Sequence, residues 1–513
     1  MGKKRLLISI FVVFWVVILM NSVAKSEDFS LFGRPGNIMG YATQGVSFGL
    51  HNNYDTERGL NSALTNLFFE GDYSPHDKLK LYLSGLLTVD WAYQLNANRD
   101  SWNDKLFPKS RRNLNVDDKY WELLKEAHVT WTPGDFMFRV GKQIVAWGET
   151  DGFRLMDQIN PLDQRRGFAD VEFETSIIPI WLLRAEYNVP ITKTSWLQNL
   201  NLQFVFNPNA DFIPNQGIMA GNADGGIWAP DLDLIPGSHL ATAYGPIRTP
   251  KRWSEGNEFA FRIMGVVYDS VVTLNGFYGR DNDFVSKLIP PFISPLPPHI
   301  FASDRKLLLH VFQEGYYPLF RYVGATFSRD IIPLKASFLG GVAPVLRLET
   351  FYAFDNTFTF ANPLTSAQRF EKSDEFRGAV GIDWKVKIPF LNAKTYFSIS
   401  PQFYYRRIVD FPSIENVTAS GGTGGTPVKE NNYQTTLMIS TSYFHNKLTP
   451  SFFWLRDINS ASDMYRFQLV YDYSDKWHFT LGALLIDGFK KAQGFQVFDN
   501  KDQIYFKIGY KWS

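Results

Sequence analysis

Apolar and polar residues alternate with a period of two along much of this chain. In the last segment, Ile504 to Trp512, five apolar or aromatic residues share one face, and polar or small residues occupy the other. This period predicts a β-strand with one apolar face. Segments of about ten residues with this pattern are typical of strands that cross a lipid bilayer at a tilt. The same alternation occurs in residues 79–93, 376–386, 465–473 and 477–485.

The connections between these segments alternate between short and long. Outer-membrane barrels have short turns on the periplasmic side and long loops outside. We therefore predict an all-β fold, a single antiparallel transmembrane β-barrel of about 18 strands, with 16 as the nearest alternative. The short connections contain turn residues and lie at 74–77, 132–135, 269–270, 445–447 and 474–476. The long ones lie at about 94–121, 145–176, 207–256, 280–317, 355–374 and 408–432.

Composition agrees with a barrel. Aromatic residues make up 16% of the chain, yet the mean hydropathy is −0.18. A soluble sandwich or propeller is the rival architecture, but no blade-like repeat occurs. The net charge of +1 gives no bias toward nucleic acid. Because cysteine is absent, we predict neither a lipid anchor on cysteine nor a disulfide nor a thiol nucleophile.

The amino-terminal residues have the organisation of a secretory signal. Lys3, Lys4 and Arg5 precede an apolar run from Leu6 to Met20, and small residues follow at 22–24. We predict a cleaved signal peptide at 1–24, with a second possible cut after Ala24–Lys25–Ser26, and a barrel at 25–513. An uncleaved anchor is the alternative, but fifteen apolar residues are few for a helix that needs about 20 to span a bilayer. The predicted location is the outer membrane of a Gram-negative cell.

The region from 123 to 170 departs from simple strands. Leu123–Trp131 and Phe136–Gln143 are predicted to form a hairpin. Strict alternation sends Lys142 toward lipid, where a lysine costs about 2–4 kcal/mol. We therefore expect either a bulge at Gly141 that turns Lys142 inward or the end of the strand. The lumen-facing residues predicted on this hairpin are Glu122, Glu126, His128, Thr130, Arg139 and Gln143.

The segment after this hairpin has the composition of a compact, charged loop. Asp151 is a candidate cap for a short helix that ends before Pro161. Asn160, Pro161 and Gly167 are suited to the cap, first position and end of a second helical turn. Two other segments, the glycine-rich 420–427 and the proline-rich 290–298, are predicted to be exterior loops.

The region from 139 to 163 contains the stretches RVGKQ at 139–143, WGE at 147–149 and DQINPLD at 157–163. In these stretches the chain resembles the domain of unknown function 1302 family of bacterial outer-membrane barrels. The resemblance implies a channel or export conduit that works with periplasmic lipid-handling proteins and a resistance-nodulation-division (RND) pump. Lys142 stands where the family commonly has arginine, which weakens a bidentate carboxylate site at this position.

Our functional hypothesis is a conduit for small hydrophobic or amphipathic solutes, narrowed by residues 145–176 folded inward. An exterior loop with solvated charges is the alternative. The two other functional classes are a non-catalytic scaffold or sleeve around a partner and an outer-membrane hydrolase. We predict that the protein is not an enzyme and that it binds no cofactor, metal or nucleic acid. We also predict that it contacts outer-membrane lipid. The predicted constriction residues are Glu126, His128, Arg139, Lys142, Gln143, Trp147, Glu149, Arg154, Asp157, Asn160, Asp163, Arg165 and Arg166.

Overall fold

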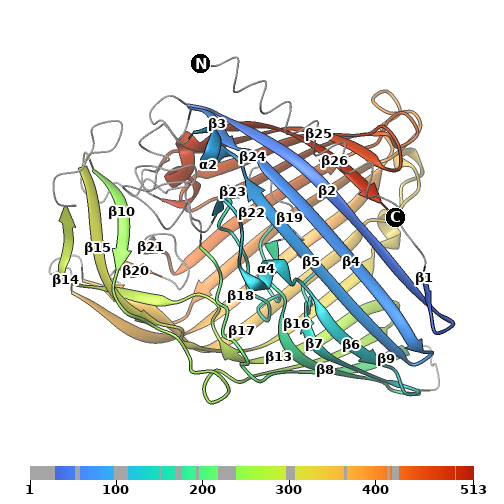
Figure 1. Ribbon diagram of the computed structural model, residues 1–513, viewed down its shortest axis with the longest axis horizontal. Helices are drawn as coiled ribbons and strands as arrows, with labels where there is room; N and C mark the ends of the chain where they lie inside the picture. The colour runs from blue at the N-terminus through green and yellow to red at the C-terminus, as the bar shows by residue number, and fades with distance from the viewer. Residues whose placement is uncertain are drawn as a thin grey trace.

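The protein is described by a computed structural model, shown in Figure 1. The predicted signal peptide, Asp151 and residues 420–426 of the glycine-rich segment lie outside the residues that the structure describes. Those residues are 29–51, 58–96, 114–150, 152–167, 176–191, 196–217, 238–295, 307–362, 367–412, 416–418, 427–490 and 493–512.

Eighteen antiparallel strands form a closed barrel, as the sequence predicted. The barrel closes between β26 and β2, with Trp512 opposite Gly40 and Gln503 opposite Gly49. The first nine strands around the barrel are β2 (Arg34–Leu50), β4 (Leu64–His76), β5 (Leu79–Asp90), β6 (Ala127–Trp131), β7 (Phe136–Gln143), β8 (Ile180–Asn188), β9 (Leu197–Asn207), β12 (Glu258–Val267) and β13 (Ser270–Arg280). The second nine are β16 (Leu319–Asp330), β17 (Val345–Ala361), β18 (Gln368–Val386), β19 (Phe397–Ile408), β22 (Asn431–Ser440), β23 (Leu448–Asp457), β24 (Ser462–Asp472), β25 (Trp477–Gly488) and β26 (Gln503–Trp512).

The two faces of the wall differ as the alternation predicts. On β5, Leu81 and Leu83 are exposed on the outside, whereas Ser84 and Thr88 are buried on the inside. On β26, Ile504 and Phe506 are exposed on the outer face. Within the described residues, no helix is long and apolar enough to cross a membrane.

The predicted short turns lie at one end of the barrel and the long loops at the other end, which also has the short turn 458–461 between β23 and β24. The predicted loop at 355–374 is wrong, because β17 and β18 continue through most of it as a paired extension. Short strands β1 (Phe29–Leu31), β3 (Arg58–Ser62), β20 (Asn416–Thr418) and β21 (Pro427–Val428) pair at the rims. Short helices are α2 (Ala92–Leu95), α4 (Tyr120–Leu123), η2 (Ile332–Leu334), η3 (Ser337–Leu339) and η5 (Gly494–Lys501).

A second, four-stranded sheet lies at the long-loop end and was not predicted. It stands at the left of Figure 1, away from the carboxyl terminus. β14 covers much of the proline-rich segment, so that segment is largely strand rather than irregular loop. β15 pairs in parallel with β10 and β11, and antiparallel with β14. The strands are β10 (Ser238–Tyr244), β11 (Ile247–Arg248), β14 (Val285–Pro295) and β15 (Leu307–Tyr316).

Candidate functional site

The predicted hairpin is present, but its first strand is shorter than expected. β6 begins at Ala127, and the helical turn α4 occupies residues 120–123, where the sequence predicted the end of a loop and the start of a strand. Glu122 is therefore not a lumen-facing strand residue. It is buried in the wall and paired with Lys125, at 3.2 Å between Oε1 and Nζ.

The inner face of the hairpin carries the predicted polar side chains. Val129 and Val140 are exposed on the outer face, which places His128 and Arg139 inside. The His128 ring stacks on Tyr82, with 5.0 Å between ring centroids. Arg139 donates from Nε to Thr130 Oγ1 at 2.9 Å, and it lies opposite Arg184 in the register. Glu126 accepts the main-chain N–H of Ile144 at 3.2 Å, and Gln143 donates to the carbonyl of Leu182 at 3.1 Å.

Lys142 is buried without the predicted bulge. The register of β7 with β6 and β8 is continuous across Gly141, whose φ is +133°. Instead, α4 covers the lysine. The Lys142 Nζ donates to the carbonyl of Trp121, at 3.0 Å, and to the carbonyl of Leu124. The charge is thus satisfied by the free carbonyls at the end of a helical turn, which is a favourable position for a cation.

Residues 145–150 and 152–160 fold into the barrel. Val145, Trp147, Leu155, Met156 and Ile159 are at most 5% exposed and form one apolar cluster with strand residues. Those strand residues face the lumen, because their neighbours on the outer face, including Leu183, Phe204 and Val323, are exposed. We call residues 145–167 the inner segment. The strand residues of the cluster are Ile180, Leu182, Val205, Ala260, Phe277, Phe320, Tyr322, Phe351, Ala353, Ala379 and Tyr404.

Carboxylates fix the main chain of the inner segment. Glu349 of β17 accepts the N–H groups of Glu149, at 2.9 Å, and of Met156, at 2.5 Å. Asp157 accepts those of Trp147, at 2.5 Å, and Gly148, at 2.9 Å. Of these four residues only Met156 lies inside a predicted helix, and its bond to Glu349 takes the place of a helical hydrogen bond. No helix occurs in the described residues 152–167, so both predicted helical turns are wrong.

Asn160 is the central hydrogen-bonding residue of the inner segment. It accepts the N–H of Val145 at 2.8 Å and donates to the carbonyls of Gln143 and Ile178 at 3.1 and 3.0 Å. Arg154 donates to the carbonyl of Asn160 at 2.9 Å. Asn160 therefore joins the two ends of the segment to each other rather than capping a helix.

Two further contacts tie the inner segment to two separate strands of the wall, β9 and β17. The indole N–H of Trp147 donates to Gln203 of β9 at 2.5 Å. Arg347 of β17 donates to the carbonyl of Glu149 and pairs with Asp383 of β18 at 2.7 Å. The segment therefore contacts the wall through both polar and apolar groups.

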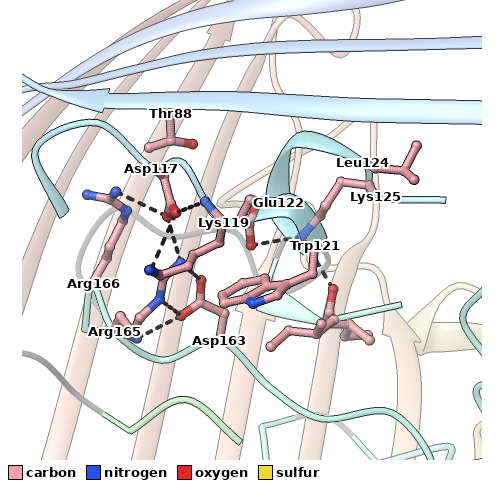
Figure 2. Close-up of polar contacts among 12 residues, drawn as sticks. Thr88, Asp117, Lys119, Trp121, Glu122, Leu124, Lys125, Asp163, Arg165 and Arg166 are labelled. Carbon is pink, nitrogen blue, oxygen red and sulfur yellow. Dashed lines mark hydrogen bonds and ion pairs between the residues drawn. The ribbon is translucent and has the colours of Figure 1, made fainter. Parts of the chain in front are cut away.

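The end of the inner segment lies in a buried ion cluster, shown in Figure 2. Arg165 is 1% exposed and contacts Asp117 at 2.6 Å and Asp163 at 2.7 Å. Arg166 lies 3.5 Å from the same Asp117 carboxylate and donates to the carbonyl of Leu114 at 3.0 Å. The Arg165 guanidinium also lies over the Trp121 ring, 4.6 Å from its centroid. Asp163, Arg165 and Arg166 thus bind to the wall and not to the charges of the central lumen.

The wall next to this cluster is unusual. Pairing between β5 and β6 covers only residues 79–83 of β5. Beyond it, residues 114–126 continue the wall, with main-chain bonds from Asp117 to Thr88 and from Lys125 to Ser84, both at 2.9 Å. We call residues 114–126 the wall insert. Val116, Tyr120, Leu123 and Asp118 are exposed on it, whereas Asp117, Glu122 and Lys125 are buried. The three buried charges and the exposed apolar side chains suit a segment with lipid on one side.

The structure brings together more than the sequence indicated. The sequence found most charged residues of the inner segment but missed their partners on the wall. Glu349, Arg347 and Gln203 lie at lumen-facing positions of ordinary strands, and alternation alone does not mark them. Asp117 lies in a predicted loop. A charged residue at a lumen-facing strand position was the available signal, but many strands have one.

Fold and inner segment together define a closed β-barrel of the outer-membrane type with a chain segment folded into its lumen. The chain belongs to the family described as protein of unknown function (DUF1302), whose model matches residues 49–512. The sequence resemblance to this family is thereby confirmed. No curated protein is recognisably similar to the chain in sequence.

Several solved outer-membrane proteins resemble the fold. A BenF-like porin from Pseudomonas fluorescens Pf-5 has 8% identity and a TM-score of 0.46, covering 94% of this chain and 100% of the porin. OccD3 (OpdP) of Pseudomonas aeruginosa has 7% identity and a TM-score of 0.44, covering 95% and 93%. OmpT of Vibrio cholerae, in its trimer form, has 8% identity and a TM-score of 0.39, covering 93% and 99%.

Proposed function

We propose that this protein is an outer-membrane channel for small hydrophobic or amphipathic solutes, and that the inner segment forms its constriction. One observation carries the proposal. Residues 145–150 and 152–160 lie inside the closed barrel, and hydrogen bonds to Gln203 on β9 and to Glu349 and Arg347 on β17 hold them against the wall. Irregular backbone at membrane depth is tolerated where it is buried in protein or lines water.

The chemistry of the inner wall supports the solute class. Aromatic rings surround the inner segment, and Phe153 of the segment packs edge-on against Tyr404, with centroids 5.2 Å apart. Charges of both signs lie nearby: Arg184 pairs with Glu186 on β8, and Arg139 lies beside them. Apolar surface interrupted by paired charges suits a molecule with an apolar body and a polar group.

The second candidate function is a passive sleeve around a periplasmic or extracellular partner. For either function, the partners that we propose are periplasmic lipid-handling proteins and an RND-type pump. We propose no catalytic role and no cofactor. Within the described ranges, no group of three or more histidine or acidic side chains is arranged to hold a metal ion.

Planar-bilayer recording of the purified protein tests the proposal. A selective channel gives discrete current steps that an amphipathic solute, such as a medium-chain fatty acid, reduces and glucose does not. Large steps that no solute changes indicate a general pore, and the absence of current indicates a sleeve. Either result refutes the proposal.

Alanine variants localise the effect. Arg139→Ala and Glu149→Ala are expected to change ion preference, because each removes one charge beside the inner segment. Lys476→Ala, in an exposed turn, is the control and leaves the preference unchanged. Equal ion preference in all three variants would place the constriction elsewhere.

A further inference from the structure

Three adjacent turns at the short-turn end differ from the others. They connect β16 to β17, β18 to β19, and β22 to β23, and they comprise residues 331–344, 387–396 and 441–447. These strand pairs are neighbours around the barrel, so the three turns form a continuous surface. By the usual orientation of such barrels this end faces the periplasm. We call these turns the periplasmic ridge.

The ridge exposes large apolar side chains to an unusual extent. Phe338, Phe390 and Phe444 are 81%, 86% and 70% exposed. The lipid-facing residues on the strands below, such as Leu348 and Phe403, are less than half as exposed as the two most exposed of these rings. Apolar groups of this size, gathered in one place, mark a binding surface. Further apolar residues of the ridge that are at least half exposed are Ile332, Leu334 and Leu391.

The charge of the ridge has one sign. Its three turns contain four lysines and no aspartate or glutamate. In contrast, four other turns at the same end each contain an aspartate: Asp77, Asp135, Asp269 and Asp475. A surface that combines apolar side chains with lysines complements an anionic, amphipathic ligand. The ridge lysines are Lys335, Lys387, Lys394 and Lys447.

Hydrogen bonds between the turns hold the ridge in shape. The N–H of Lys387 donates to the carbonyl of Leu339 at 2.8 Å, and the Tyr396 hydroxyl donates to that of Gly340 at 3.0 Å. The buried Asn392 joins the second turn to the third through Thr441 Oγ1, at 3.0 Å. In the third turn, Phe444 and the two residues after it have φ between 50° and 66°, which non-glycine residues rarely adopt. The apolar tips are therefore presented by an ordered framework.

We propose that the periplasmic ridge binds the headgroups of anionic phospholipids in the periplasmic leaflet of the outer membrane. The three turns follow directly from strands whose outer faces contact lipid, so the ridge lies at the level of the headgroups. Its aromatic side chains enter the acyl region, and its lysines contact the phosphates. The site is separate from the inner segment and does not depend on what the barrel transports.

Native mass spectrometry of lipids retained by the protein tests this proposal. The protein is reconstituted in nanodiscs with equal phosphatidylglycerol and phosphatidylethanolamine, and then released in mild detergent. One lysine near an anionic surface is worth a factor of about five in binding. We therefore expect the native protein to retain phosphatidylglycerol at least about fivefold over phosphatidylethanolamine. High salt reduces this preference, because it screens exposed charges.

A matched pair of variants identifies the surface. Lys394→Gln/Lys447→Gln removes two exposed ridge lysines and is expected to bring retention of the two lipids close to parity. Lys78→Gln/Lys476→Gln removes two exposed lysines from other turns at the same end and leaves the preference intact. The Phe390→Ser/Phe444→Ser variant is expected to lower the retention of both lipids. A gel-mobility shift on heating confirms that each variant forms a folded barrel.

Three results would overturn the proposal. The first is native protein without preference for phosphatidylglycerol. The second is an equal loss of preference in the ridge and control variants. The third is a result of crosslinking in cells. Because the chain has no cysteine, a photo-crosslinker attached to the Phe390→Cys variant labels one position only. Crosslinks to a soluble periplasmic protein in place of phospholipid would assign the ridge to a protein partner.

Discussion

Removing the side-chain amide of Asn160 should release the inner segment without opening the barrel. The Asn160→Ala variant loses three hydrogen bonds to main-chain groups, at 2.8, 3.1 and 3.0 Å, from a position that is 1% exposed. Each such bond contributes about 1 kcal/mol net. The free energy of local opening should therefore fall by about 3 kcal/mol, which is a change of about 100-fold in the opening equilibrium.

Hydrogen exchange followed by mass spectrometry measures this opening. We expect exchange in peptides from 145–162 to accelerate by about 100-fold, while exchange in the barrel strands stays unchanged. Gln158→Ala is the control in the same segment, because it removes one bond, to the carbonyl of Leu155 at 2.9 Å. If Asn160→Ala exchanges no faster than Gln158→Ala, Asn160 does not hold the segment and our account of its anchoring is refuted.

Three further predictions concern groups around the inner segment. Arg165→Met leaves Asp117 buried without its main partner and should lower the free energy of local opening of the wall insert by about 3–5 kcal/mol, measured as faster hydrogen exchange in 114–126. The double variant Asp117→Leu/Arg165→Met should recover part of this loss, and no recovery would contradict the reasoning. Lys142→Met should expose 120–126 to protease, whereas Lys142→Arg should protect it, because an arginine can still donate to the two carbonyls. Burial raises the pKa of Asp211 to about 6 against the charge of Arg252, so the packing of its loop is strongest at low pH and weakens as the pH rises through 6. Asp211→Asn should abolish this pH dependence in the protection of residues 208–217 against hydrogen exchange, taken relative to the intrinsic exchange rate at each pH.

The barrel could be predicted from the sequence because its signal is repeated. Every strand that spans the membrane has the same period, and the turn residues sort by length. The closing strand from Ile504 to Trp512 was found in this way, and its pairing with β2 confirms it. Where strands extend beyond the membrane, as in β17 and β18, composition resembles that of a loop, and the prediction failed.

The inner segment was harder to predict, for a physical reason. Asn160, Pro161 and Gly167 have the residue types of a helical turn, but local preference is weak. Met156 lies inside the first predicted helix, yet its main-chain N–H bonds to Glu349 on a strand 193 positions away. The same holds for Lys142, where alternation identified the problem of a charge facing lipid. Its solution is a helical turn at 120–123, where the sequence predicted the end of a loop and the start of a strand.

Single-channel conductance of a variant without the constriction tests the central claim most directly. In this variant, residues 149–158 are replaced by a short glycine-serine linker. If the inner segment narrows the lumen, the variant should conduct at least about twice as much current per channel as the native protein, with weaker ion preference. Equal conductance and equal preference in the two proteins would contradict the claim that this segment limits passage through the barrel.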